Sequence, residues 1–273
     1  WYGQRDFNNI KPGPDYPVAL TPKNLVKNGH APQVVYSEAC YGGHILEKSE
    51  DMALALKFIS VGAMGMVGST TISYGSAAAP LIGADLLGYH FWKYMKDGLT
   101  TGEALMQAKV ALVKDMNQRQ GFLDGEDQKT LISFVLYGDP LVTFSSTKTK
   151  ARRVMRAKGM THIMTICDRR NGDLTGVNVT AEMLYEVKKA VEPYLPGLEQ
   201  AEMTISQQHV TCDSKAHVCP TNKLGVKVSH PDKVEGIVMT FCQKVAVDQL
   251  THRHYARVTV NGRGKVVKLA LSR

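Results

Sequence analysis

The sequence has no hydrophobic run of the roughly 18 residues that a membrane helix needs, so no membrane span is expected. Its most apolar stretch, residues 58–82, is broken by glycines and a proline and predicts buried core and loops. Charged residues make up only 21% and hydrophobic residues 44%, which excludes a disordered or collagen-like chain. The chain opens on Trp1, without an initiator Met or a signal peptide. We therefore expect a processed form or a part of a longer protein.

The net charge of +8 is not spread evenly along the chain. Residues 1–150 contain equal numbers of basic and acidic side chains, so the whole excess lies in residues 151–273. Zinc-finger spacing and a basic-aromatic platform for single strands are both missing, and nucleic acid is not an expected partner. We interpret the excess as a solvated basic surface, with a polyanion-binding site as an alternative.

Five cysteines are an odd number, so at least one stays free or pairs outside the chain. Cys212 and Cys219 flank a short polar loop and are candidates for a local disulfide. With His217 they also suggest a metal site, but three ligands match zinc spacing poorly, and no metal is expected. Cys167 and Cys242 end apolar runs and are predicted to be buried thiols. Cysteine usage leaves the redox compartment open.

The first half of the chain alternates strand-like and helix-like segments. Short apolar runs predict buried strands, and apolar residues at helical spacing predict amphipathic helices, with Ser49 and Thr101 as the expected N-caps. This alternation is typical of a mostly parallel sheet covered by helices, an α/β fold. The expected strands are 33–39, 63–69 and 131–137, and the expected helices are 50–60, 80–96 and 101–117.

The second half reads as a smaller α+β or β-rich C-terminal domain, because strand-like runs dominate it. The sequence Asn261-Gly262-Arg263-Gly264 predicts a hairpin turn between its last two strands. We expect a catalytic-type domain in 1–147, a basic linker in 148–159 and the C-terminal domain in 160–273. The expected strands are 160–166, 202–211, 223–229, 234–245, 254–261 and 264–271, with one helix near 180–192.

Functional groups of an open parallel sheet gather beyond the carboxyl ends of its strands. The three predicted strands end in Ser37–Gly43, Gly68–Thr71 and Gly138–Pro140. Cys40, between a buried strand and Gly42-Gly43, lies where an attacking thiol would be placed. The glycines allow a substrate carbonyl and backbone N–H groups to approach, as an oxyanion site requires. A structural role for Cys40 stays open on this pattern alone, and Gly138-Asp139-Pro140 is interpreted as an architectural turn.

The segment Glu38-Ala39-Cys40-Tyr41-Gly42-Gly43 resembles the nucleophile segment of the caspase-like (clan CD) cysteine proteases, which include caspases, legumain, clostripain and the gingipains. The strand ends Gly68–Thr71 and Leu136–Pro140 are most similar to the gingipain branch. The resemblance covers roughly residues 1–145. It implies a caspase-like fold and a cysteine endopeptidase that cleaves protein or peptide substrates through a thioacyl intermediate on Cys40. No cofactor is expected, and calcium is not indicated by the sequence.

The resemblance also implies a catalytic His, followed by Gly, at the end of the strand that precedes the Cys strand. No such pair is found in this chain. We therefore expect it upstream of residue 1, on an upstream segment or on a processed partner chain. Within the chain, His44 is a weak candidate because it follows Cys40 on the same turn, and His30 is weaker still. Both are expected to be exposed loop histidines.

Glu38 is the predicted specificity residue, since strand side chains alternate and place it on the same side as Cys40. The resemblance implies that this position lines the pocket for the residue before the scissile bond. A carboxylate there favours Arg or Lys, with Asn as runner-up. Ser69, Thr70 and Thr71 are expected to form another wall. The alternative is that Glu38 is a solvated or capping carboxylate.

The basic linker offers Arg152, Arg153 and Arg156 as sites of self-processing by such an enzyme. Family analogy favours a secreted or cell-envelope location and leaves a cytoplasmic one open. Two other functions compete with the peptidase. One is a catalytically inactive caspase-like interaction protein, and the other is a basic polyanion-binding protein whose binding would depend steeply on salt.

Overall fold

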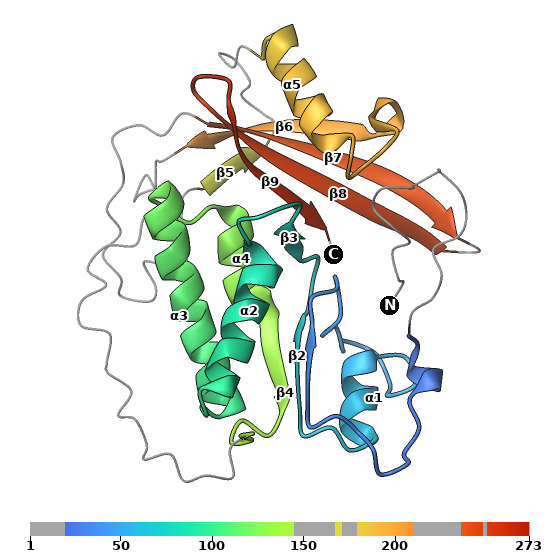
Figure 1. Cartoon of the computed structure of the whole chain (residues 1–273). Coiled ribbons are helices and arrows are strands. Elements are labelled where there is room, and N and C mark those ends of the chain that lie inside the picture. The colour runs from blue at the N-terminus through green and yellow to red at the C-terminus, as the bar shows by residue number, and fades with distance from the viewer. Residues whose placement is uncertain (1–19, 145–166, 171–178, 210–235, 248–249, 273) are drawn as a thin grey trace, which may run out of the picture.

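The computed structural model describes residues 20–144, 167–170, 179–209, 236–247 and 250–272 (Figure 1). Up to residue 144 the elements are η1 (Pro22–Asn24), β1 (Val34–Ser37), α1 (Leu54–Ser60), β2 (Gly65–Ser69), β3 (Tyr74–Ser76), α2 (Gly83–Lys96), α3 (Thr101–Gln120), α4 (Gly125–Ser133) and β4 (Phe134–Gly138). The later elements are β5 (Cys167–Arg170), α5 (Ala181–Val191), η2 (Leu198–Gln200), β6 (Glu202–His209), β7 (Gly236–Val247), β8 (Leu250–Asn261) and β9 (Val266–Ser272).

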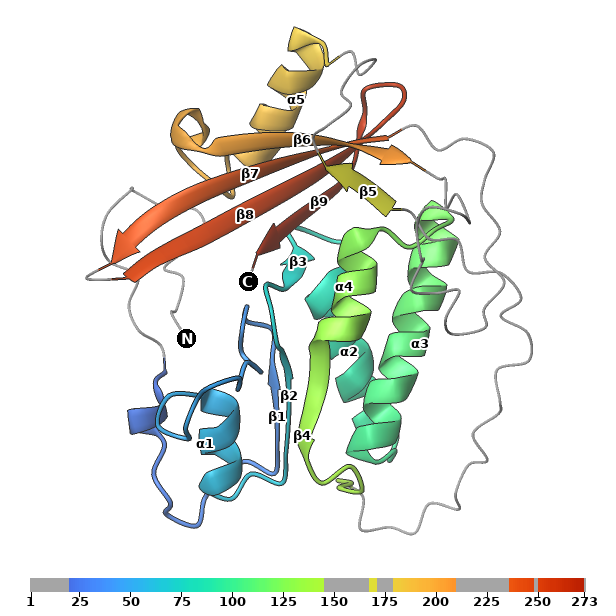
Figure 2. The same cartoon turned by 180° about the vertical axis from the view of Figure 1, so that it is seen from behind.

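A three-stranded sheet in the order β1-β2-β4 forms the centre of the N-terminal part. Helix α1 lies on one side of it and helices α2 and α3 on the other (Figures 1 and 2). Both faces of β2 are therefore buried: Met66 packs in the core with Phe58 of α1, and Val67 in the core with Phe91 of α2. Full burial on both faces explains the continuous apolar run of this strand. The predicted mixed α/β character is confirmed.

The sheet is less parallel than the sequence predicted. β1 pairs with β2 in parallel, but β4 runs antiparallel to β2, with Gly138 opposite Gly65 and Phe134 opposite Ser69. The carboxyl end of β4 therefore lies at the opposite edge of the sheet from the end of β1. The direction of a strand depends on the path of the chain that leads to it, which for β4 ends with helix α4. The apolar run of β4 does not encode that direction.

Helix α4 was missed by the sequence prediction, which assigned 131–137 to a strand. Asp124 is its N-cap, with a carboxylate that accepts hydrogen bonds from the N–H groups of Glu126 and Asp127. The helix ends at Ser133 and the strand begins at Phe134, so the apolar run straddles the boundary between them. An Asp cap in a polar segment was the available signal.

The expected helices lie close to their predicted ranges, but their starts differ. Thr100, rather than Thr101, caps α3 and forms a capping box with Glu103. Helix α1 begins after Ala53 rather than Ser49, whose carbonyl accepts hydrogen bonds from a preceding turn. Helix α2 begins at Gly83, three residues after Pro80, rather than at the proline.

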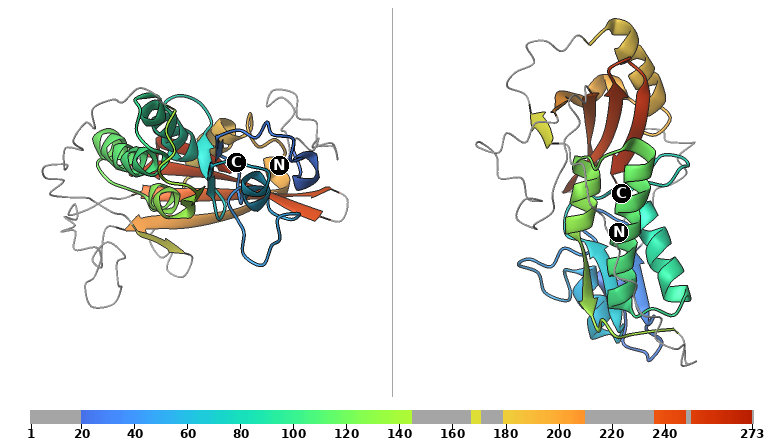
Figure 3. Two further views of the ribbon diagram at one scale, coloured as in Figure 1. Left: turned by 90° about the horizontal axis from the view of Figure 1, so that it is seen from below. Right: turned by 90° about the vertical axis from the view of Figure 1, so that its left-hand side faces the viewer.

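The second sheet has six strands in the order β3-β9-β8-β7-β6-β5, and each neighbouring pair is antiparallel. Helix α5 covers the face that points away from the N-terminal part, as the right-hand view of Figure 3 shows. Its buried residues Val187 and Val191 pack in one core with Phe241 of β7 and Val258 of β8. The turn that follows β8 is closed by a hydrogen bond from Gly264 N to Asn261 O, at the position of the predicted hairpin.

The two parts of the molecule share this second sheet. Strand β3 belongs to the N-terminal part in sequence, yet it pairs with β9 through Tyr74–Ser272, Gly75–Leu271 and Ser76–Ala270. Ala270 is also buried in the core that contains α2 and α3. A strand of three residues is too short to leave a periodic pattern, which explains why the sequence did not reveal it. The boundary near residue 148 stays a prediction.

Several predictions concern residues outside the described ranges. They are the linker 148–159 with Arg152, Arg153 and Arg156, the Cys212–Cys219 disulfide, and the strands 160–166 and 223–229. Cys242 is a free thiol, half-buried rather than fully buried as expected. In the described part of the chain, no helix is long and apolar enough to cross a membrane. The same residues contain no cluster of side chains suited to a metal ion.

Candidate active site

Cys40 lies in a tight turn that begins two residues after β1 ends. Its side chain is half-buried, and Sγ donates a hydrogen bond to the backbone carbonyl of Ser73 over 3.4 Å. A thiol is a weak donor, and the long distance agrees with a weak hydrogen bond. Ser73 belongs to the segment between β2 and β3. The thiol therefore points across to the end of the neighbouring strand.

The turn around Cys40 is fixed by backbone hydrogen bonds to the segment after β2. Tyr41 N donates to Thr71 O and Gly43 N donates to Ser69 O, both at 2.8 Å. Tyr41 has a φ of 58°, a left-handed conformation that is uncommon for a bulky residue. Such conformations persist only where the surroundings impose them, and they concentrate at functional sites. The nucleophile thus precedes a residue in an unfavourable conformation that its neighbours maintain.

Close packing explains both glycines after the nucleophile. A Cβ on Gly43 would lie 2.6 Å from the carbonyl oxygen of Gly68, and one on Gly42 would overlap the Ser37 hydroxyl. Gly42 N donates to Ala39 O, and Gly43 N is bonded as described above. Both N–H groups therefore serve the turn in this structure, while an oxyanion role for them stays a prediction. The steric need for glycine belongs to the architecture of the turn.

Two residues that hold this turn were not singled out from the sequence. Ser73 contributes twice, since its carbonyl accepts the Cys40 thiol and its hydroxyl donates to Glu38 O. The hydroxyl of Tyr137, on β4, donates to Gly43 O from the other side. Ser73 belongs to no motif, and Tyr137 lies in the strand end Leu136–Pro140 without a predicted role. A hydrogen bond to a residue distant in sequence leaves no signal in one sequence.

The three predicted wall residues after β2 differ in their exposure. Ser69 is fully buried, with Oγ 3.0 Å from Thr71 O and 3.1 Å from Ser133 Oγ, so its hydroxyl serves the interior. Thr70 and Thr71 are half-buried, and their hydroxyls donate to the carbonyls of Ser133 and Ile72. Of the three, only the two threonines have solvent-exposed surface, and a role as a pocket wall stays a prediction for them.

Glu38 is exposed and lies over the first half of α2. A Cβ added to Gly88 would lie 3.2 Å from Glu38 Oε1, which shows how near the carboxylate comes to that helix. Burial, followed by the charges of Glu38 and Asp85, raises the pKa of Tyr36 well above its usual value. Glu38 therefore supplies accessible negative charge on the α2 side of the Cys40 segment. Ser73 contacts both Glu38 and Cys40: its hydroxyl donates to Glu38 O, and its carbonyl accepts the hydrogen bond of the Cys40 thiol.

The described residues 20–144 contain three histidines, His30, His44 and His90. His44 is half-buried against the Tyr41 ring, 5.8 Å between centroids, and its Nδ1 has no hydrogen-bond partner among the described residues. His30 is an exposed loop residue, as expected. His90, on α2, is buried and bonds Asp115 through Nε2 at 3.0 Å.

Gly138-Asp139-Pro140 does not join the site, contrary to the expectation that all three strand ends meet. Because β4 is antiparallel to β2, this segment lies beside the start of β2, where Asp139 N donates to Met64 O. Asp139 Oδ1 accepts a hydrogen bond from Leu141 N over 2.8 Å. The segment is an architectural turn at the other edge of the sheet.

Comparison with known proteins gives one match. Residues 17–145 match the model of peptidase family C25, and neither the curated proteins nor the solved structures contain a match to the chain. The matched residues contain Cys40, the glycine turn and both segments that hold it. The family found by this comparison agrees with the gingipain resemblance of the nucleophile segment. Residues 17–145 of the chain are thus similar to peptidase family C25, the gingipain family of cysteine peptidases.

Proposed function

We propose that this protein is a cysteine endopeptidase with Cys40 as its nucleophile and a preference for Arg or Lys before the scissile bond. The observation that carries the proposal is the presentation of the Cys40 thiol in a fixed turn at the carboxyl end of β1. The match of residues 17–145 to a cysteine peptidase family supports the reaction class. Further support is that Glu38 and Cys40 follow the carboxyl end of β1 and that the two threonines follow that of the neighbouring parallel strand β2.

The reaction begins with attack of the Cys40 sulfur on the carbonyl carbon of the substrate. A base accepts the thiol proton and passes it to the leaving amine as the C–N bond breaks. Water then attacks the thioester, which releases the new carboxylic acid and restores the thiol. The hydrogen bond from Sγ to Ser73 O must break first, because a thiolate has no proton to donate.

We assign the base to a histidine outside the described residues. Within these residues β1 pairs with a strand on one side alone, namely β2. A further parallel strand on the side of β1 that faces away from β2 would end beside Cys40, because the carboxyl ends of parallel strands lie at the same end of the sheet. That position suits the His-Gly strand that the resemblance places before the Cys strand, on an upstream segment or a partner chain.

Labelling with an Arg-directed, thiol-reactive peptide probe tests this proposal on the present chain and on one extended upstream. We expect the probe to modify Cys40 in the extended chain, and the Cys40→Ala variant to abolish the labelling. Peptide mass mapping locates the modified residue. The proposal fails if neither chain is labelled at Cys40 while a small alkylator still reaches Cys242, the half-buried free thiol of β7.

The specificity rests on Glu38, whose carboxylate would pair with a basic side chain. We expect Glu38→Gln to reduce kcat/KM for Arg and Lys peptides about 10- to 100-fold and to change Asn peptides little. Glu47→Gln is the matched control, since Glu47 is another exposed carboxylate in the loop after Cys40. A wild-type preference for Asp peptides would contradict the assignment.

The same specificity directs self-processing to the basic linker at Arg152, Arg153 and Arg156. We expect the active chain to be cut there during purification and the Cys40→Ala variant to stay whole. Intact mass measurement distinguishes the two, and equal cutting of both proteins would assign the cleavage to another protease.

A further inference from the structure

The segment that holds Cys40 continues directly into the second sheet. Residues 71–73 accept the turn's N–H and thiol hydrogen bonds, and strand β3 begins at the next residue, Tyr74. In the described sheet, the strand partner of β3 is β9, with Tyr74 opposite Ser272. The nucleophile is thus connected to the last described strand by one short, fully buried element.

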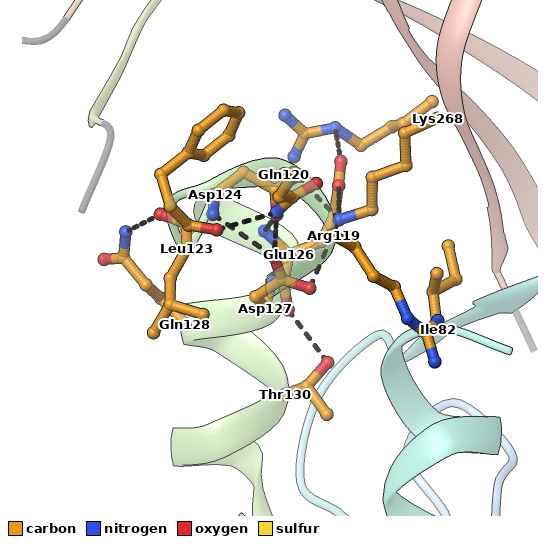
Figure 4. A network of polar contacts seen from close by, with 12 residues as sticks. Ile82, Arg119, Gln120, Leu123, Asp124, Glu126, Asp127, Gln128, Thr130 and Lys268 are labelled. Carbon is orange, nitrogen blue, oxygen red and sulfur yellow. Dashed lines mark hydrogen bonds and ion pairs between the residues drawn. The ribbon is translucent and has the colours of Figure 1, made fainter. Parts of the chain in front are cut away.

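Strand β9 is itself anchored to the N-terminal part by a buried cluster of charges (Figure 4). Lys268 Nζ lies 2.6 Å from Asp124 Oδ2, 3.0 Å from Glu126 Oε2 and 3.2 Å from Asp127 Oδ1. All four side chains are at least nine-tenths buried, and the three carboxylates sit at the start of α4. Arg257 of β8 adds a second ion pair, 2.6 Å from Glu126 Oε1.

The electrostatics make Lys268 the centre of this cluster. Although burial disfavours its ammonium, the three carboxylates raise the pKa of Lys268 above its usual value, so it stays charged. Burial, and then repulsion from Asp124, raise the pKa of Asp127 to about 8. Removal of the lysine would leave buried carboxylates without their common partner, which is among the costliest changes in a protein interior.

Tyr74 connects the charge cluster to the nucleophile. Its ring lies 5.9 Å from the Arg257 guanidinium, which in turn bonds Glu126. Burial raises the pKa of Tyr74 to about 12; Arg257 opposes this, and Glu126 and then Cys40 add to it. Contacts therefore run without a gap from Lys268 through α4, Arg257 and β3 to the segment that accepts the Cys40 thiol.

We propose that β9 is a positioning element of the active site and that Lys268 is its positioning residue, acting through β3 on the segment 71–73 that holds Cys40. The coupling of Lys268 to residues 71–73 does not depend on the proposed function, whereas its effect on catalysis rests on that function. The second sheet then contributes to the active site, because it holds the segment whose Ser73 carbonyl accepts the hydrogen bond of the Cys40 thiol. A domain that merely follows the peptidase would not have this effect.

Two substitutions of similar size test the proposal. Lys268→Met removes the buried charge, and Lys244→Met removes a lysine whose ion pair with Glu202 is exposed. The readout is the alkylation rate of Cys40 by iodoacetamide, with Cys242 of β7 as the internal reference in the same molecule. We expect Lys268→Met to raise the Cys40 rate about tenfold over the Cys242 rate, because residues 71–73 no longer cover the thiol. Lys244→Met should change neither rate.

A purely structural role would alter both cysteines together, since general unfolding exposes both sheets. Equal acceleration of Cys40 and Cys242 would therefore overturn the proposal, as would alkylation rates that do not change at all. Lys268→Arg retains the charge and should restore most of the wild-type ratio. If Lys268→Met does not fold, hydrogen exchange of the wild-type protein decides. Amides of residues 71–76 should then exchange at the rate of residues 268–272, and independent rates would contradict the coupling.

Alkylation needs no peptidase activity, so the two proposals can fail separately. In the active, upstream-extended protein we also expect Lys268→Met to lower kcat about 10- to 100-fold with a smaller change in KM, because a displaced nucleophile affects the reaction more than binding. A protein without peptidase activity that still shows the selective Cys40 effect would refute the proposed function and retain the positioning role.

Discussion

At the scale of single residues, the site depends on contacts that leave no room for a side chain. Gly43 passes so close to Gly68 that the two backbones touch, and the turn carrying Cys40 is bonded to β2 at this point. The sequence drew attention to Cys40, Gly42 and Gly43 because they form a motif. It could not reveal Ser73, because a hydrogen bond between distant residues leaves no local pattern.

Gly43→Ala is expected to destabilise the protein by about 1–3 kcal/mol, because the new methyl group would force two backbones apart. It should also disturb Cys40, which precedes it in the same turn. Urea unfolding and Cys40 alkylation measure the two effects. Gly65→Ala is the control, since a Cβ there meets its nearest neighbour at 3.6 Å, an ordinary contact, and little change is expected. Equal stability of both variants would contradict the close-packing argument.

Asp127 gives the stability of the protein a dependence on pH. Its pKa is raised from 3.8 to about 8 by burial and by Asp124, so the folded protein binds a proton that the unfolded chain releases. This contribution to stability is fully present below about pH 3.8 and is lost as the pH rises through about 8. We expect the free energy of unfolding to fall from about pH 4 to about pH 8 and to level off above that.

The Asp127→Asn variant, which cannot ionise, should show a shallower fall over the same range. Denaturant titrations at several pH values provide the comparison. Glu126 also has a pKa raised by burial, so some slope is expected to remain. An identical slope in both proteins would place the proton elsewhere.

At the scale of elements, the boundaries follow from hydrogen-bonding side chains more than from apolar periodicity. Helix α3 illustrates this, because the sequence placed its cap at Thr101 and the structure places it at Thr100. Thr101 is buried instead, and its hydroxyl donates to Asp139 O over 2.8 Å. Two adjacent threonines are equivalent in a sequence, and only the tertiary contact of the second one decides which of them caps.

Thr100→Ala is expected to cost about 1 kcal/mol of stability, because the N–H of Glu103 loses its acceptor at the helix start. Thr100→Ser keeps the hydroxyl and should cost much less. Thermal unfolding of the two variants provides the measurement. If the serine variant is as unstable as the alanine variant, packing of the threonine methyl rather than capping determines the loss.

Most strands and helices of the N-terminal part could be predicted because they are either periodic or continuously apolar, but helix α4 was missed. The direction of β4 and the existence of β3 could not. Direction depends on the chain's path through α4, and β3 is three residues long and acquires its structure from β9. The strand before Cys40 was predicted, with an end two residues later than that of β1, and the contacts of residues 71–73 with the Cys40 turn were not predicted.

At the scale of the whole molecule, the two parts are joined by a shared sheet, a shared core and a buried charge cluster. Residues 1–147 made alone would lose β9, the Ala270 packing and the partner of three buried carboxylates. We expect this fragment to be unfolded, or less stable by more than about 3 kcal/mol, since loss of one partner of a buried ion pair alone costs that much. Circular dichroism and urea titration of the fragment and the whole chain provide the test. A fragment as stable as the whole chain would instead show that residues 1–147 fold as an independent domain.

The pairing of β3 with β9 also bears on how the protein is made. The ribosome completes the turn with Cys40 well before β9, the strand with which β3 pairs, because β9 lies far downstream in the sequence. At typical rates of synthesis the two are separated by ~10–40 s. Throughout that interval residues 71–73 are present, but β3, which follows them, lacks its strand partner. If β9 positions Cys40 as proposed, the nucleophile is expected to become fully aligned only after β9 has been made.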